Sequence, residues 1–346
     1  MNLEEYDYTL PAELIAQEPA AARDQSKLMV LPFGTDTVYH RKFFNLPEFI
    51  QKGDLLVVND TEVFPARLIG RKEPDGGKVE LFLLKPYKNE TWDALSRPAR
   101  RLHTGSILVF GDGLLRSKIV EKGIHGHVRV QLESELPIDT VIDRIGKTPL
   151  PPYIKREPVE SDRERYQTVY AKYRGSVAAP TAGLHFTQAV LDLLISRGVV
   201  VASVTLHVGI GTFRPLRTKE AQGNRLHSEY CRVPYETAQT VKECRMRGGR
   251  VIAVGTTTAR ALESAAINGE IMPFDGWTDI FIKPPFTFRV VDVLLTNFHL
   301  PRSSLLLMVC AFAGKEKILH AYREAVKKRY RFYSYGDTML IMRSKL

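Results

Sequence analysis

The hydrophobic and polar positions of this chain change their period along the sequence. From residue 62 to residue 132, short runs of alternating apolar and polar residues follow one another at close spacing: EVFPARLIGR, GGKVELFLL, TWDALSR, SILVF, LLRSKIVEK and HVRVQL. Turn-forming residues separate these runs, as at 74–77 and 111–113. Several short strands with no helical period between them predict a small all-β barrel.

After Pro137 the period changes, and helical and strand-like patterns alternate. A helical pattern over residues 187–197 ends at Gly198 and is followed by the strand-like run VVVASVTLHV. A second helical pattern over residues 236–247 ends at Gly248 and is followed by RVIAVG. This alternation predicts a layered α/β domain with a mixed, largely parallel sheet.

The N-terminal runs LMVLPF and GDLLVVND are expected to complete the same sheet. The sequence therefore predicts an α/β catalytic domain made of residues 1–61 and 148–346, with residues 62–147 forming an inserted β-barrel domain. A cleft is expected where the two domains meet.

One more helix is predicted between the barrel and the 187–197 pattern. Ser161 and Glu164 have the spacing of a capping box, which marks a helix start. The residues that would form one apolar face of this helix are Tyr166, Val169, Tyr170 and Tyr173.

The segment SVAAPTAGLHFT, residues 176–187, has the composition of a turning backbone rather than of a core strand. Gly183 allows positive φ or the close approach of a ligand, and Thr181 and His185 add polar groups. Thr187 is a good N-cap for the apolar run that follows. The segment suits a site for a small polar or anionic ligand. Taken alone, it is equally compatible with a tight connection between a strand and a helix.

Four downstream segments also place polar groups at expected strand ends or turns, where open α/β sheets bind ligands. They are LHVGIGTF with His207, Gly209 and Gly211; HSEY with His227 and Glu229; VGTTTAR with Thr256, Thr257 and Arg260; and LTNFHLP with Asn297 and His299, before a helix expected to begin at Pro301. The hydroxyls and amides of the threonine run could hold a carboxylate or a phosphate. The alternatives are ordinary loop glycines and simple N-capping, which needs only one threonine.

The net charge of +10 and the pI near 9.4 favour a polyanionic partner. The cationic residues gather in RPARR, in KECRMRGGR and near the C-terminus, and the candidate RNA contacts are Arg97, Arg100, Arg101, Lys327, Lys328 and Arg331. Charged helix faces can also be merely solvated. The aromatic residues Tyr322, Tyr330, Phe332, Tyr333 and Tyr335 interleave with the last cluster, as base-stacking residues do. Tyr322 and Tyr330 instead fit a core stripe with Ile318 and Val326.

Other features bound the class of protein. No apolar run approaches the roughly 20 residues of a membrane span, and the N-terminus lacks the pattern of a signal peptide. The cysteines Cys231, Cys244 and Cys310 form no C-x-x-C pair, which argues against a disulfide framework or a zinc site. A cytoplasmic, metal-free monomer is the expectation.

Together these motifs resemble the S-adenosylmethionine:tRNA ribosyltransferase-isomerase family. The resemblance rests on SVAAPTAGLHFT, TLHVGIGTF, HSEY, VIAVGTTTAR, LTNFHLP and YRFYSYGDTML, and upstream on YDYTLPAELIAQEP, GDLLVVNDTEVFPARL, GGKVELFLL and TPLPPYI. It covers essentially the whole chain. One departure is the sequence Lys283-Pro284-Pro285, where the family usually has a Tyr-Pro-Gly turn.

The resemblance implies an enzyme that uses S-adenosylmethionine as a ribosyl donor and needs no true cofactor. The ribosyl part would be transferred to the aminomethyl group of 7-aminomethyl-7-deazaguanine at the wobble position of tRNA, and isomerised to give epoxyqueuosine. Adenine and methionine would leave.

Such chemistry needs acids and bases with pKa values near neutrality. The pair His227 and Glu229 is the first candidate for proton transfer and His185 the second, while Asp279 could balance the sulfonium or orient a histidine. Two other classes compete: an RNA-binding module without catalysis, and an atypical S-adenosylmethionine-dependent tRNA methyltransferase. The first strands end in Pro32-Phe33 and Asn59-Asp60-Thr61 rather than in a glycine-rich turn, which disfavours the methyltransferase.

Overall fold

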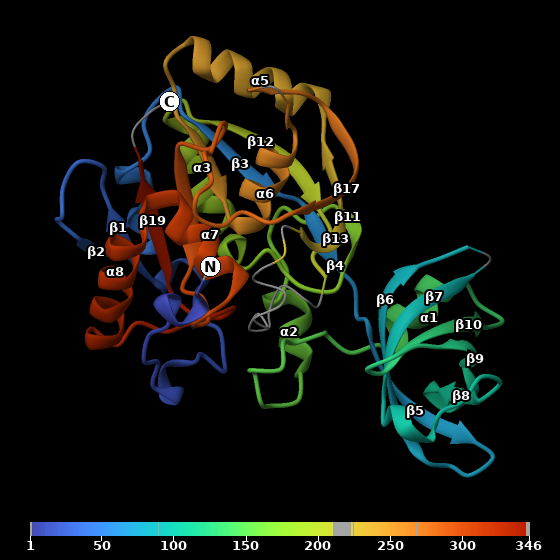
Figure 1. The fold of residues 1–346 in the computed structure, drawn as a ribbon. Helices are drawn as coiled ribbons and strands as arrows, with labels where there is room; N and C mark the ends of the chain where they lie inside the picture. Colours follow the sequence, from blue (N-terminus) through green and yellow to red (C-terminus); the bar gives the residue numbers. More distant parts are fainter. Residues whose placement is uncertain (1, 89, 210–222, 224, 268, 344–346) are drawn as a thin grey trace.

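The computed structural model describes residues 2–88, 90–209, 223, 225–267 and 269–343 (Figure 1). A nine-stranded mixed sheet with helices on both faces forms the larger part, and a closed six-stranded barrel projects from one side of it. The sheet order is β17-β13-β12-β3-β14-β18-β19-β1-β2. This architecture confirms the predicted fold class.

Parallel strands form the centre of the large sheet. They are β12 (Val200–Leu206), β3 (Leu55–Asn59), β14 (Val251–Val254) and β18 (Val293–Asn297). Every residue of β3, β14 and β18 is buried, because helices cover both faces and the strands are continuously apolar.

Strands of mixed direction extend this centre at both sides. β13 (Arg225–Val233) and β17 (Phe274–Ile280) add antiparallel strands beside β12. Beside β18 lie β19 (Thr338–Met342), β1 (Lys27–Leu31) and β2 (Tyr39–Lys42). The N-terminal runs therefore join the sheet as β1 and β3, as the sequence predicts.

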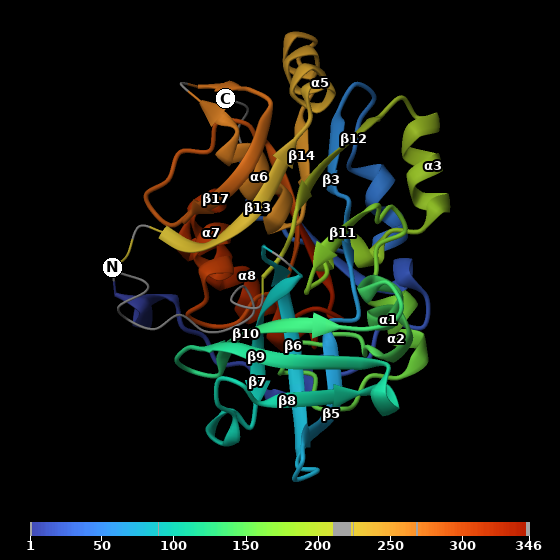
Figure 2. The ribbon, with the colours of Figure 1, turned by 90° about the vertical axis from the view of Figure 1, so that its right-hand side faces the viewer.

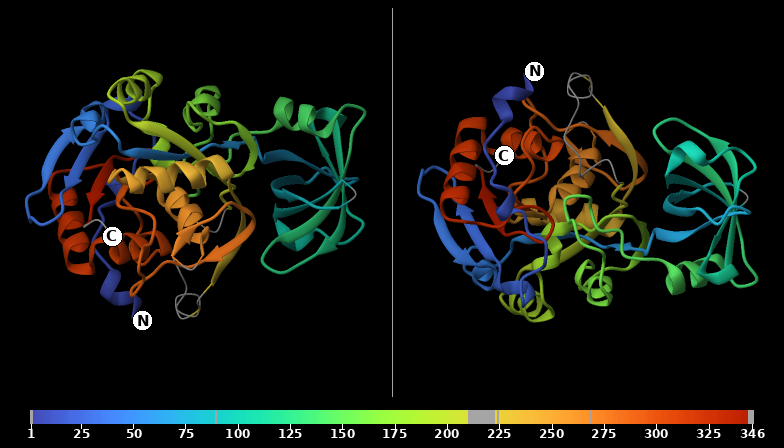
Figure 3. Two further views of the ribbon diagram at one scale, coloured as in Figure 1. Left: turned by 90° about the horizontal axis from the view of Figure 1, so that it is seen from above. Right: turned by 90° about the horizontal axis from the view of Figure 1, so that it is seen from below.

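Two helical layers bury the faces of the sheet (Figures 1 and 3). On one face, α3 (Gln188–Ser196) packs with the 3₁₀ helix η4 (Phe43–Glu48). The opposite face is covered by α5 (Tyr235–Met246), α6 (Thr256–Ser264), α7 (Ser304–Ala313) and α8 (Lys315–Lys327). Thr187 caps α3 by accepting a hydrogen bond from the Val190 amide at 3.2 Å, which confirms its predicted role.

The barrel closes in the order β10-β7-β6-β5-β8-β9. Its strands are β5 (Arg67–Glu73), β6 (Lys78–Pro86), β7 (Thr91–Arg97), β8 (Ile107–Phe110), β9 (Leu115–Lys122) and β10 (His127–Glu133). Helix α1 (Ile138–Ile145) packs Val141 and Ile142 into the barrel core. The expected all-β module is thus confirmed.

Short elements complete the two parts and the connections between them. β4 (Thr61–Val63) pairs with β11 (Tyr173–Ser176) in a small parallel ribbon on the barrel side of the large sheet (Figure 1). The remaining short elements are η1 (Leu3–Tyr6), η2 (Ala12–Leu14), η3 (Arg23–Gln25), η5 (Ala99–Arg101), η6 (Gly111–Gly113), α2 (Glu160–Arg165), η7 (Thr181–His185), β15 (Ala266–Ile267) and β16 (Glu270–Ile271).

The predicted start of the helix after the barrel is wrong. Helix α2 begins at Glu160, and the carboxylate of Asp162, not of Glu164, accepts from the Val159 amide at 2.8 Å. The helix ends at Arg165, so the expected apolar face does not form, and Tyr173 lies on β11. The reason is a long-range one: Asp162 is buried between Arg156 and the Tyr335 hydroxyl, which fixes it at the helix start.

Two further expectations at the C-terminal side need correction. Helix α7 does not begin at Pro301, because Ser303 is its N-cap and accepts from the Leu306 amide at 3.2 Å. The aromatic side chains of Phe332, Tyr333 and Tyr335 are buried, so they belong to the core together with Tyr322 and Tyr330 and offer no surface for base stacking. Among the described residues, no helix has the length and apolar character of a membrane span.

Candidate active site

The carboxyl ends of the four central parallel strands meet at one edge of the sheet and bring several of the predicted segments together. Asn59, at the end of β3, connects two neighbouring segments at this edge. Its side-chain amide donates to the Leu206 carbonyl at 3.0 Å and to Thr257 Oγ1 at 3.2 Å. Its Oδ1 accepts from the Leu206 amide at 3.0 Å. Asn59 thereby joins the His207 segment to the start of α6.

A buried ion pair lies beside this junction. Arg260 of α6 donates through Nη1 to the carboxylate of Glu229 on β13, and the two side chains are only 3% and 6% exposed. The other oxygen of Glu229 accepts from the Gly209 amide at 2.7 Å. The Nε and Nη2 groups of Arg260 are buried and make no hydrogen bond to the residues that the structure describes. Because such donors are costly to leave unpaired, they are suited to an acceptor group of a ligand.

His207 lies next to this ion pair, at the end of β12. Its Nδ1 is 2.8 Å from Thr61 Oγ1, and burial lowers its pKa while Asp60 opposes that shift. Thr205 donates to the Asp60 carboxylate at 2.7 Å. A Cβ on Gly175, where φ is +154°, would lie 2.5 Å from the His207 ring, so the ring position depends on a glycine there.

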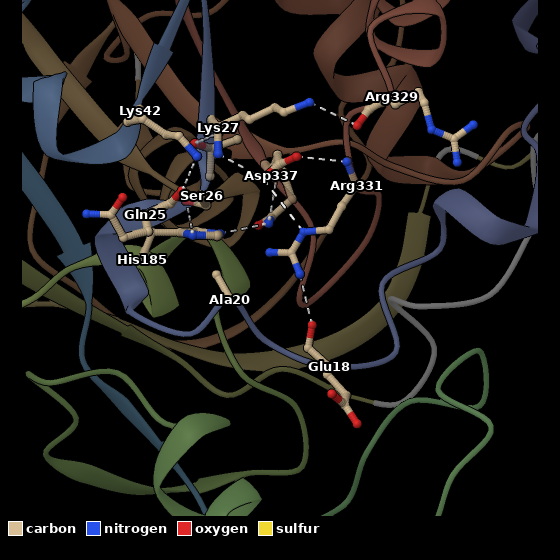
Figure 4. A network of polar contacts seen from close by, with 12 residues as sticks. Glu18, Ala20, Gln25, Ser26, Lys27, Lys42, His185, Arg329, Arg331 and Asp337 are labelled. Carbon is tan, nitrogen blue, oxygen red and sulfur yellow. Dashed lines mark hydrogen bonds and ion pairs between the residues drawn. The ribbon is translucent and has the colours of Figure 1, made fainter.

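His185 occupies a second polar cluster, at the end of β18. Its Nδ1 is 2.7 Å from Ser26 Oγ and its Nε2 is 3.2 Å from the amide nitrogen of Asn297, while Thr181 donates to Asn297 Oδ1 at 2.8 Å. Since the Asn297 amide can only donate, the proton of the ring lies on Nδ1 and points to Ser26. Figure 4 shows His185 and Ser26 beside Lys27, Asp337 and Arg331. Burial lowers the pKa of His185 to about 3, so the ring is neutral.

His299 belongs to the same cluster. Its Nε2 is 2.8 Å from Thr296 Oγ1, Tyr8 donates to its carbonyl oxygen, and burial lowers the pKa of its ring to about 3. A cavity of about 20 Å³ lies here, lined by Tyr153, Thr181, Asn297, His299, Leu300, Ser303, Leu305, Tyr333 and Ser334. This volume is close to the space of one water molecule, so in this conformation the cluster is closed.

Of the three glycines of the predicted site, the two that the structure describes differ in their surroundings. A Cβ on Gly183 would lie 2.1 Å from the Tyr170 hydroxyl, so glycine is needed here for packing against Tyr170. Gly209 leaves ordinary contact distance to Glu229 and uses its amide instead. Gly211 lies outside the described residues.

His227 and Glu229, the first candidate pair for proton transfer, lie in different environments: His227 is exposed and Glu229 is buried. β13 shifts register between Arg225 and Glu229, which leaves His227 exposed while the carboxylate of Glu229 turns inward to Arg260. Asp279 lies on β17, 3.3 Å from Arg225. Thr256 and Thr257 are both buried at the start of α6, beside Gly255.

The candidate RNA contacts lie on separate surfaces. Arg97, Arg100 and Arg101 are exposed on the barrel, and Lys327 and Lys328 are exposed at the end of α8. Arg331 is half-buried: its guanidinium donates to the Glu18 carbonyl at 3.1 Å and lies 3.9 Å from Asp337. Figure 4 shows this arrangement, which leaves Arg331 less free than the two lysines to contact phosphate.

The departure at Lys283 adds a contact of its own. The ammonium of Lys283 donates to the Gly223 carbonyl at 2.7 Å and lies 4.9 Å from the centre of the Phe281 ring.

The residues Asn59, Ser26 and Tyr170 complete the two clusters but were not among the predicted site residues. Among the residues that the structure describes, no group of three or more His, Cys, Asp or Glu side chains could hold a metal ion.

An open α/β sheet with polar side chains at the carboxyl ends of its parallel strands, joined to a small barrel, defines a ligand-binding protein of the α/β class. Residues 3–341 match the family model described as queuosine biosynthesis protein, and the chain belongs to this family.

Similar proteins of known sequence and structure agree with this assignment. The S-adenosylmethionine:tRNA ribosyltransferase-isomerase of Pelotomaculum thermopropionicum is 50% identical over 343 residues, which are 99% of this chain and 100% of that protein. That of Heliobacterium modesticaldum is 51% identical over 344 residues, with 99% and 100% covered. The crystal structure of S-adenosylmethionine tRNA ribosyltransferase from Thermotoga maritima is 40% identical, covers 98% of this chain and all of its own, and has a TM-score of 0.57.

Proposed function

We propose that this protein is a transferase that moves the ribosyl part of S-adenosylmethionine onto the aminomethyl group of 7-aminomethyl-7-deazaguanine at the wobble position of tRNA. The ribosyl part is isomerised, the product is epoxyqueuosine-tRNA, and adenine and methionine are released. The observation that carries this proposal is the full-length match, at about half identity, to ribosyltransferase-isomerases.

S-adenosylmethionine is proposed to bind at the edge where β12, β3 and β14 end. Arg260 supports this location, because its buried Nε and Nη2 make no hydrogen bond within the described part of the chain and can donate to a carboxylate such as that of the methionine part. Glu229 holds Arg260 in place and adds negative charge near the sulfonium. His207 and Thr257 border the same edge through Asn59.

The candidate bases for proton transfer, His227 and His185, differ in their exposure to solvent. His227, exposed on β13, remains the first candidate base, with Glu229 as the neighbouring carboxylate in sequence. His185 is a less suitable base in this conformation, because both ring nitrogens are engaged and its pKa lies at about 3. We assign it a positioning role: it fixes Asn297, which in turn holds Thr181.

The tRNA contributes an unpaired wobble base, which can be splayed from its loop into a pocket at modest cost. Exposed cationic residues on the barrel and at the end of α8 supply phosphate contacts. Within this proposal the protein works as a cytoplasmic monomer without a metal or a true cofactor. Its catalytic domain comprises residues 1–61 and 148–346, and residues 62–147 form the inserted domain.

The decisive experiment is incubation with S-adenosylmethionine and tRNA that carries the deazaguanine precursor. Adenine and methionine as products support ribosyl transfer, whereas S-adenosylhomocysteine would show methylation and the absence of turnover would leave an RNA-binding module. Retention of full activity after dialysis against EDTA tests the metal-free expectation, and light scattering of the eluted protein tests the monomer.

A further inference from the structure

A row of aromatic rings lies on one side of the β12-β13-β17 end of the large sheet, near the barrel. His207, directly after β12, stacks on Tyr230 of β13, with centroids 5.3 Å apart and planes inclined by 27°. Tyr230 meets Trp277 of β17 edge to face, with centroids 6.1 Å apart. The register pairs Tyr230 with Trp277 directly, so the rings lie on one side of the sheet. We call these three residues the stacking face.

Trp277 is the exposed end of this row. Its exposed fraction is 56%, although an indole is among the side chains that gain most from burial. Figure 2 shows β13 and β17 above the barrel strands β6 and β10. Trp277 itself lies next to the barrel, because Lys85 of β6 contacts its ring. An exposed aromatic group next to another domain is typical of a binding surface.

Cationic side chains border the stacking face. Lys85 of β6 reaches across from the barrel and places its ammonium 4.7 Å from the centre of the Trp277 ring. Arg232 of β13 and Lys172 lie over the Tyr173 ring, at 5.8 Å and 5.0 Å. All three cationic residues are exposed. The nearby carboxylate of Asp275 accepts from the Tyr230 hydroxyl at 2.8 Å.

Exposed aromatic rings interleaved with cations fit single-stranded nucleic acid, because bases stack on the rings while the cations contact phosphates. We propose that the stacking face binds unpaired nucleotides of the tRNA anticodon loop, with one base on Trp277. This inference rests on the proposed function and locates the loop on the sheet beside the barrel rather than at the end of α8. The flexible side chain of Lys85, now over the indole, would move to a phosphate when a base takes its place.

The chain offers a direct optical test, because Trp277 and Trp92 are its two tryptophans. Trp92 is a half-buried residue of the barrel that packs near Phe64. In a Trp92→Phe protein, the indole fluorescence comes from Trp277 alone. Titration with a synthetic anticodon stem–loop RNA should quench this fluorescence, whereas a blunt duplex RNA without unpaired nucleotides should not.

Affinity measurements provide the second readout. Trp277→Ala should weaken binding of the stem–loop about tenfold, and Trp277→Phe should retain part of the affinity, because stacking of one base is worth about 1–3 kcal/mol. The matched control is Tyr235→Ala, which removes an aromatic ring of similar exposure, 61%, from α5. This control should bind as the unchanged protein does.

The outcomes separate this inference from the proposed function. RNA that binds without quenching Trp277, or a Trp277→Ala protein with unchanged affinity, would overturn the stacking face while leaving ribosyl transfer intact. Equal quenching by the duplex would overturn recognition of unpaired nucleotides. A wild-type protein that binds neither RNA would overturn both proposals.

Discussion

Arg260 and Glu229 form an ion pair in the interior of the molecule, where a guanidinium whose Nε and Nη2 find no partner among the described residues meets a carboxylate that also accepts from Gly209. Separation of such a pair leaves an uncompensated buried charge. The same ion pair therefore contributes both to the stability of the fold and to the proposed site for S-adenosylmethionine.

Glu229→Gln is expected to lower the free energy of unfolding by about 3–5 kcal/mol, because Arg260 then keeps its charge without a counter-ion. Urea denaturation measures the change, and adenine release measures the accompanying loss of turnover. The control is Glu236→Gln, an exposed carboxylate on α5, which should leave both quantities unchanged. A Glu229→Gln protein as stable as the unchanged one would contradict the buried pair.

The neutral histidines make stability depend on pH. The folded-state pKa values of His185 and His299 lie at about 3, below the value near 6.5 expected in the unfolded chain. Between these values the unfolded chain binds more protons, so the stability is fully present above pH 6.5 and is lost as the pH falls toward 3. Each ring accounts for a loss on the order of 2 kcal/mol by pH 5.

Urea denaturation between pH 7 and pH 5 measures this slope. The slope should be shallower in His185→Asn, whereas the exposed His320→Asn of α8 should behave as the unchanged protein. An unchanged slope in His185→Asn would argue that His185 is protonated in the folded state.

His227→Ala is expected to reduce turnover at least about tenfold while leaving tRNA affinity intact, because loss of a general base slows a chemical step. Product formation under saturating substrates and a separate binding assay give the two quantities. Ser228→Ala, the exposed neighbour on β13, is the control. Near-normal turnover would remove His227 from the catalytic residues.

The affinity for tRNA should fall steeply as the salt concentration rises, since each phosphate contact releases counterions. Binding measured at several salt concentrations gives the slope. On the barrel, the double substitution Arg100→Gln with Arg101→Gln removes two exposed cations, so the slope of log affinity against log salt concentration should become shallower by about two. The double substitution Lys327→Gln with Lys328→Gln tests the end of α8 in the same way. A flat response to salt would contradict phosphate binding.

Gly175→Ala is expected to displace the His207 ring and to break its hydrogen bond with Thr61, because the new Cβ would lie 2.5 Å from the ring. The control is Gly53→Ala, where φ is +88° but an added Cβ would meet no described atom within 4 Å beyond its chain neighbours, so it carries backbone strain without the clash. Turnover should fall in the first variant and persist in the second. Equal activity of both variants would exclude a role for the His207 position.

The sequence predicted the central sheet and the barrel well, because a fully buried strand and an alternating strand each leave a local pattern. It failed at α2, where Asp162 is fixed by Arg156 and Tyr335 from distant segments. It also missed Asn59, since a single polar residue at a strand end has no period to reveal it. The closed surroundings of His185 depend on Ser26, far away in the chain, and no local pattern shows that both ring nitrogens are engaged.

Strand β19 lies between β18 and β1, and Asp337 just before it accepts from the backbone amides of Lys27 and Arg331. During synthesis on the ribosome, β1 and β18 emerge before β19. Until β19 follows, β1 and β18 each keep one unpaired edge, and the Asp337 carbonyl that the Asn297 amide contacts is missing. A chain terminated before β19 would thus lack a finished sheet, and the polar cluster around Asn297 can form only after residues 337–342 have been synthesised.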